Sequence, residues 1–137
     1  EFDRIRNFAA DYTAAWSSHE PDRVASFYSE TGSLTVNEGD PLRGREAIAA
    51  FALSFVTAFP DFELDMNELR TQSGTIEYHW TFTGTNTGPG GTGKAVRFSG
   101  FEEWTFDENG LVAISLGQFD DNEYRHQLEH GVERSPE

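Results

Sequence analysis

The sequence predicts an α+β domain, in which three N-terminal helices pack on one face of a strongly curved, mainly antiparallel sheet. Apolar residues recur at helical spacing up to about residue 59, and from Phe62 onward the period changes to two. The chain also lacks the strand-helix alternation of a parallel α/β fold. Because 137 residues fit one core, we expect a single domain over 1–137 that ends in a short helix.

Three helices are expected before residue 60. The first covers about residues 2–18, and Pro21 suits the first turn of a second, shorter helix. The third begins after Gly44 and ends at Pro60. The inward-facing residues of the three helices are, in order, Phe2, Ile5, Phe8, Ala9, Tyr12 and Trp16; Val24, Phe27 and Tyr28; and Ala47, Ile48, Phe51, Ala52, Phe55 and Phe59.

Strands make up most of the second half of the chain. A short strand at 33–36 and a polar loop at 37–41 precede the third helix. Four strands then form an antiparallel meander, in which apolar residues such as Tyr78 and Phe82 alternate with polar ones such as His79. His79 is therefore expected on the outer sheet face. The four strands are predicted at 62–70, 75–84, 95–106 and 111–119.

Charge and composition exclude several classes of function. The chain has 24 acids, 10 bases and a formal charge of −14, with one lysine, Lys94. The electrostatic field of this net negative charge repels phosphate backbones and anionic membranes, so we expect neither nucleic acid nor a membrane as partner. Two interpretations of the acidity stay open: a surface adapted to high salt, which predicts stability rising with salt, or an ordinary acidic surface.

Cofactor and metal chemistry find little support in the sequence. The absence of cysteine excludes disulfides, a thiolate nucleophile and a zinc–sulfur site. Glu123, His126 and His130 have helical spacing but offer at most half of a metal site, so we expect neither metal nor cofactor. No run of about 18 apolar residues occurs and the first residues lack signal-peptide order, so a cytoplasmic protein is expected.

Asp120 is the first candidate for catalysis. It stands where the last strand ends and a short helix begins, beside apolar residues. Two roles fit this place: a proton-transferring carboxylate in a dry pocket, or the N-cap of the helix. Asp121 is the neighbouring alternative, and it can cap the helix if Asp120 points inward.

Glu102 and Tyr12 are the other candidate catalytic residues. Glu102 alternates with apolar residues and is expected inward, although Glu103 can take that place. Tyr12 is either a core aromatic or a hydroxyl donor at the pocket. The residues expected to bind substrate are the aromatic side chains Trp80, Trp16, Phe55 and Trp104, together with Asn37 or Glu38 from the polar loop.

Several short segments carry a family resemblance. They are Phe27-Tyr28 before a strand, the segment 41–48, the run 80–88, Thr92-Gly93-Lys94, and Phe119-Asp120 seven residues before Gln127-Leu128. Together they resemble the SnoaL-like polyketide cyclases, within the cone-shaped superfamily of nuclear transport factor 2 and ketosteroid isomerase. The chain departs from the pattern at Asn86, where many members have histidine, and in a short turn at 88–92.

This resemblance implies a cofactor-free enzyme that acts on a small hydrophobic carbonyl compound. Asp120 matches the cyclase acid/base residue, while Tyr12, Glu102 and Glu38 (or Asn37) match ketosteroid isomerase positions. Such chemistry needs a base with a pKa raised toward neutrality and a donor for the enolate oxygen. A silent ligand-binding or dimerisation module is the alternative, and an epoxide-hydrolase-like enzyme using Arg70 or Arg97 is a third. The fold also implies a homodimer.

Overall fold

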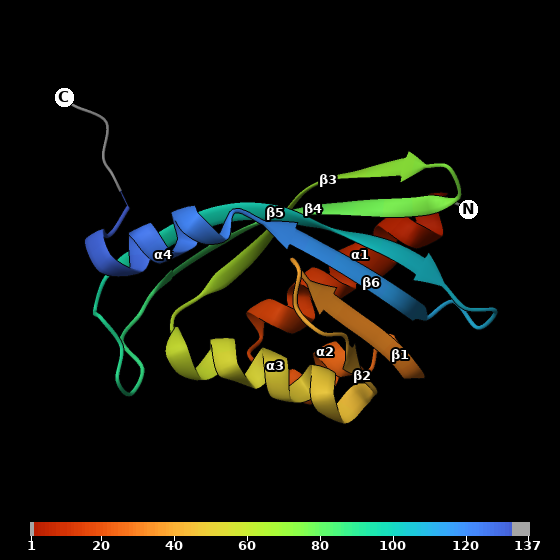
Figure 1. Cartoon of the computed structure of the whole chain (residues 1–137). Coiled ribbons are helices and arrows are strands. Elements are labelled where there is room, and N and C mark those ends of the chain that lie inside the picture. Colours follow the sequence, from red (N-terminus) through yellow and green to blue (C-terminus); the bar gives the residue numbers. More distant parts are fainter. Residues whose placement is uncertain (1, 133–137) are drawn as a thin grey trace.

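The helices pack inside a single curved sheet, giving a cone-shaped domain (Figure 1). This computed structural model describes residues 2–132, apart from the side chain of Gln72. The helices are α1 (Phe2–Ser17), α2 (Pro21–Ala25), α3 (Arg45–Ala58) and α4 (Asp121–His130). The strands are β1 (Tyr28–Val36), β2 (Leu42–Arg43), β3 (Glu63–Gln72), β4 (Thr75–Thr85), β5 (Ala95–Phe106) and β6 (Val112–Phe119). The predicted fold class is therefore confirmed.

The six strands lie in the order β2-β1-β6-β5-β4-β3. The last four form the predicted antiparallel meander, and β1 joins β6 in parallel. Irregular pairing between Met66 and Glu68 in β3, and between Thr105 and Phe106 in β5, adds local twist to the sheet. The long strands β4 and β5 bend around α1 and α3, so that these helices face the inner side of the sheet (Figure 1).

The N-terminal half of the sheet differs from the prediction. Helix α2 ends at Ala25, and Tyr28, expected on its inward face, is the first residue of β1. The reason is pairing across the sheet: Tyr28 lies opposite Val112, whose amide donates to the Phe27 carbonyl at 3.0 Å. A partner far away in the sequence thus overrides the local helical spacing. The short strand β2 was not predicted either.

The core is unusually rich in aromatic and hydroxyl groups. Tyr12, Tyr28, Tyr78 and Trp104 are all fully buried between α1 and the sheet. Asn86, where the resemblance implies histidine, is buried as well. Its side chain donates to the Ala58 carbonyl and accepts from the Thr92 amide, so it ties the 88–92 turn to the end of α3.

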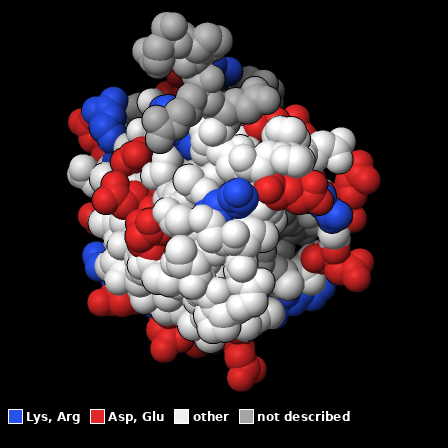
Figure 2. Space-filling view, turned by 90° about the vertical axis from the view of Figure 1, so that its left-hand side faces the viewer, with Lys and Arg blue, Asp and Glu red and all other residues white. Residues whose placement is uncertain are grey.

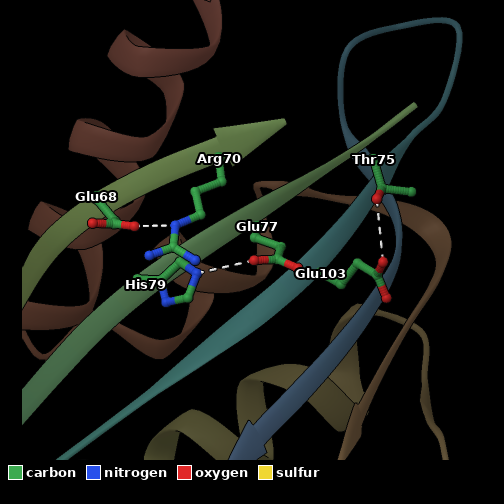
Figure 3. A network of polar contacts seen from close by, with 6 residues as sticks. All are labelled: Glu68, Arg70, Thr75, Glu77, His79 and Glu103. Atoms are coloured by element: carbon green, nitrogen blue, oxygen red, sulfur yellow. Dashed lines mark hydrogen bonds and ion pairs between the residues drawn. The ribbon is translucent and has the colours of Figure 1, made fainter. Parts of the chain in front are cut away.

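The outer sheet face is polar where β3, β4 and β5 meet. His79 lies there as predicted, 3.1 Å from Glu77, and Thr75 donates to Glu103 at 3.2 Å (Figure 3). At the end of the molecule that carries α4, acidic side chains with some basic ones among them surround a largely uncharged area (Figure 2). Among residues 2–132, no helix has the length and apolar character that crossing a membrane requires.

Candidate active site

An apolar pocket lies between the helices and the inner face of the sheet. The centres of water-sized molecules can occupy about 60 Å³ of this pocket, and the space between its lining atoms, open mouth included, is about 550 Å³. Aromatic rings form most of the wall, and they belong to Trp16, Phe51, Phe55, Trp80, Phe82, Phe98 and Phe119. Glu102 is the one ionisable side chain among the described residues that line the pocket. The site is thus a hydrophobic hollow with a single carboxyl group.

Hydrogen bonds fix the Glu102 carboxyl in place. Its Oε1 accepts from Trp104 Nε1 and from Ser115 Oγ, each at 2.8 Å. The Tyr12 hydroxyl lies 3.1 Å from both Oε1 and Oε2. The Tyr28 hydroxyl lies 3.4 Å from Oε1 and 2.9 Å from the Tyr12 hydroxyl. Within residues 2–132, Oε2 therefore has Tyr12 as its one hydrogen-bond donor, whereas Oε1 has several.

Four separate segments of the chain build this arrangement. Glu102 and Trp104 stand two residues apart in β5, so both point to the inner face. Ser115 lies opposite Trp104 in β6, while the two tyrosines come from α1 and the start of β1. The carboxyl is thus held from several directions, which limits its motion.

The surroundings of Glu102 change its acidity. Burial raises the pKa of this carboxyl above its ordinary value, and the hydrogen bonds from Trp104, Ser115, Tyr12 and Tyr28 partly oppose that rise. Burial, followed by the nearby Glu102 charge, also raises the pKa of Tyr12 and of Tyr28 well above the usual 10.0. Both phenols therefore stay neutral donors. A carboxyl with a raised pKa is better suited to take and return a proton near neutral pH.

The structure places Asp120 outside this pocket. Its side chain is exposed and caps α4, accepting from the Glu123 amide at 3.0 Å. The capping alternative is thus observed, and the expectation that Asp120 lies in a dry interior is wrong. Because β6 ends at Phe119, the Asp120 side chain satisfies the free amides of the helix that follows. A catalytic role for Asp120 stays a prediction.

Three of the expected substrate-binding residues also lie elsewhere. Asn37 and Glu38 line a polar depression together with Asp120, and this depression adjoins the apolar pocket, with which it shares Gln118 and Phe119. Asn37 adopts a left-handed φ of 52°, and its Oδ1 accepts from the Phe119 amide at 2.9 Å, so it serves the backbone. Trp104 is fully buried, and it contacts Glu102 instead of lining the pocket.

The other aromatic predictions agree with the observed pocket. Trp16, Trp80 and Phe55 line it. Glu102 points inward as expected, and it meets Tyr12. Tyr12 itself is fully buried and is absent from the pocket wall, so it contacts the carboxyl and not the space a ligand would fill.

The sequence also matches a known family. The model of the SnoaL-like polyketide cyclases matches residues 7–128. The chain belongs to this family. A search of curated proteins found no match. For a SnoaL-like chain, the departure at Asn86 is then accounted for by the two backbone hydrogen bonds of that side chain.

Solved structures of distant relatives share the fold of this SnoaL-like protein. A putative SnoaL-like polyketide cyclase from Jannaschia sp. CCS1 has 12% identity and a TM-score of 0.73, with 92% of this chain and 94% of that chain covered. A protein of ketosteroid isomerase-like fold from Catenulispora acidiphila, solved with trimethylamine, has 11% identity and a TM-score of 0.77, with 94% and 97% covered. The epoxide hydrolase/cyclase-like enzyme SalBIII has 14% identity and a TM-score of 0.77, with 90% and 95% covered.

Sequence reasoning missed two members of the Glu102 network. Tyr28 was assigned to the inward face of a helix, although Phe27-Tyr28 was among the segments that carry the family resemblance. Ser115 alternates with Gly117 and Phe119 on the inner face of β6. A hydroxyl at an inward position of an otherwise apolar strand face was the available signal, because a buried hydroxyl needs a partner.

Proposed function

We propose that this SnoaL-like protein is an enzyme that transfers a proton on a small apolar carbonyl compound, with Glu102 as the acid/base group. One observation carries the proposal: among the described residues, the pocket has mostly aromatic walls and a single ionisable side chain, Glu102, whose Oε2 accepts a hydrogen bond from Tyr12 alone. In this proposal Glu102 takes the acid/base role that was expected of Asp120.

The chemistry begins with the ionised carboxylate. Glu102 Oε2 takes a proton from the carbon next to the substrate carbonyl, and the electron pair of that C–H bond moves into an enolate. In a ketone with a β,γ double bond this enolate is a conjugated dienolate, and the protonated Glu102 returns the proton to the γ-carbon. The double bond thereby shifts to the α,β position, which is an isomerisation. If the enolate carbon instead attacks a second carbonyl in the same molecule, the proton goes to the new alkoxide, and the result is an aldol-type ring closure.

Tyr12 acts through Glu102 in this scheme. Its hydroxyl bridges both carboxyl oxygens and meets Tyr28, so it stabilises the carboxylate without touching the substrate. Tyr12 is therefore a positioning residue. This differs from the role in which Tyr12 donates directly to the substrate oxygen.

A neutral ligand fits the pocket better than an anion. The wall is mostly aromatic, and no arginine or lysine is among the described residues that line it. The chain as a whole carries a formal charge of −14, which disfavours the approach of an anion. The substrate class that follows is a neutral, ring-containing ketone.

The epoxide-hydrolase-like alternative finds less support. That chemistry needs two carboxylates with an arginine between them to activate water. The pocket wall contains one carboxyl, and both Arg70 and Arg97 are exposed residues outside it. The ligand-binding alternative uses the same pocket and predicts binding without conversion.

The test is hydrogen exchange on a model ketone. We expect the wild-type protein to accelerate exchange of the α-hydrogens of 2-tetralone in D2O, followed by NMR. Glu102→Gln should lower the rate by roughly 10²- to 10⁴-fold, the usual contribution of a general base. Asp120→Asn is the matched control, because asparagine caps helices about as well as aspartate, and it should stay within about twofold of wild type.

The two variants decide between the two carboxylates. Full activity of Glu102→Gln together with loss of activity in Asp120→Asn would return the catalytic role to Asp120. Tight binding of 2-tetralone by the wild-type protein without any accelerated exchange would support the binding module instead.

The homodimer stays a prediction. Ile114 and Leu116 of β6 are 45% and 42% exposed on the outer sheet face, where a second sheet would cover them. Gel filtration at several protein concentrations, with Leu116→Asp as the disrupting variant, measures this. A monomer at high concentration would contradict it.

A further inference from the structure

Two glycines lie close to Glu102 on neighbouring strands, and packing explains only one of them. A Cβ atom at Gly100 in β5 would lie 2.3 Å from the Gln118 carbonyl oxygen and 2.7 Å from the Trp80 ring. No side chain fits there. Gly100 is therefore a structural glycine that lets Trp80 and the neighbouring backbone approach β5.

Gly117 in β6 has no such constraint. A Cβ atom there would lie 3.5 Å from the Thr35 carbonyl oxygen and 3.8 Å from Glu102 Cγ, which are ordinary contact distances. Its φ also lies outside the left-handed region that favours glycine. Because glycine weakens the interior of a strand, its presence at a place where alanine fits needs another cause.

The place of Gly117 in the sheet indicates that cause. Gly117 lies directly opposite Glu102 in the β5–β6 pair, and both residues line the apolar pocket. Side chains of directly opposite residues stand about 5 Å apart at Cβ, so a side chain at 117 would occupy the pocket space next to the carboxyl. The glycine leaves that part of the pocket free of a side chain, next to Glu102.

We propose that Gly117 is a specificity-determining residue. The space beside it holds a bulky group of the substrate, namely a fused ring or a substituent on the carbon that exchanges its proton with Glu102. The inference rests on the proposed function and narrows its substrate class. The enzyme would then prefer ketones whose reacting carbon carries a bulky ring to ketones without a bulky group at that carbon. A strand glycine where a ligand approaches closely is a recurrent feature of such sites.

The experiment compares a wide and a narrow ketone in three proteins. The wild type, Gly117→Ala and Gly117→Val are assayed for α-hydrogen exchange with 2-tetralone and with cyclohexanone. Gly117→Ala should lower kcat/KM for 2-tetralone by about tenfold or more, the scale of one methyl group in a tight pocket, and change that for cyclohexanone by less than about threefold. Gly117→Val should lower kcat/KM for 2-tetralone further, relative to that for cyclohexanone. Ser99→Ala, at an exposed position of β5, serves as the control that leaves both rates unchanged.

Thermal unfolding separates specificity from a folding defect. Gly117→Ala should unfold at the same temperature as the wild type or higher, because alanine meets no clash and glycine weakens a strand. For each protein, kcat/KM for 2-tetralone is divided by kcat/KM for cyclohexanone. If this ratio is the same in the wild type and in both Gly117 variants, the inference is wrong, even if Glu102→Gln is inactive as proposed.

A binding measurement keeps the two proposals distinguishable. If the wild-type protein exchanges neither ketone, the proposed function fails, and 2-naphthol binding, followed by its fluorescence, decides the inference. We then expect Gly117→Val to weaken 2-naphthol binding about tenfold or more and Ser99→Ala to leave it unchanged. Equal affinities of the wild type and Gly117→Val, or no binding by the wild type, would overturn the inference.

Discussion

Removing the Tyr12 hydroxyl tests whether the buried carboxyl is a charged partner in the folded protein. Tyr12→Phe keeps the ring, which is fully buried, and deletes a donor 3.1 Å from both Glu102 oxygens. A hydrogen bond to a neutral group contributes about 0.5–1.5 kcal/mol and one to a charged group about 1.5–3 kcal/mol. The loss in free energy of unfolding should therefore rise from about 1 kcal/mol toward about 2 kcal/mol as Glu102 ionises, and we compare pH 5 with pH 9.

Urea denaturation at both pH values measures this difference, and Tyr78→Phe provides the control. Tyr78 is equally buried, and its hydroxyl bonds to Thr13 Oγ1 at 2.5 Å instead of to the carboxyl. Burial raises the pKa of both tyrosines above the usual 10.0, so neither ionises in this range. Tyr78→Phe should cost the same at pH 5 and pH 9. Equal pH dependence in the two variants would refute the account of the Glu102 network.

Two further predictions concern stability. Because burial raises the folded-state pKa of Glu102 above its unfolded value, the stability that this group contributes is complete below the unfolded pKa and is lost as pH rises through the folded pKa. Glu102→Gln should remove that decline in urea denaturation between pH 5 and pH 9, and parallel curves for wild type and variant would contradict it. The −14 formal charge predicts that the melting temperature rises between 0.1 M and 2 M KCl, since salt screens the repulsion among the acids. A melting temperature that does not change with salt would exclude adaptation to high salt.

The sequence predicted the parts of the fold that depend on local periodicity. The spacing of apolar residues located α1 and α3, and the period of two located the meander and turned Glu102 and His79 to the correct faces. The start of β1 could not be predicted, because Tyr28 joins the sheet through its pairing with β6. Local spacing carries no information on such a distant partner.

The sequence predicted several residues of the candidate site, but not how their side chains are arranged. Tyr12 and Glu102 were paired correctly, yet the carboxylate chosen as the main catalyst, Asp120, caps α4. Both roles suit an aspartate at a strand-to-helix junction, and only the direction of its side chain separates them. The donors Trp104 and Ser115 meet Glu102 through the register of β5 and β6, which the sequence pattern does not specify.

The parallel pairing of β1 with β6 has a consequence for the newly made chain. Residues 28–36 leave the ribosome long before residues 112–119. During most of synthesis β1 therefore lacks β6, the strand with which it forms hydrogen bonds in the folded protein. A strand with an unsatisfied edge invites pairing with other chains. The stretch 29–33 at its start has one charged and three hydroxyl-bearing residues, and a charged side chain on an exposed edge disfavours such pairing.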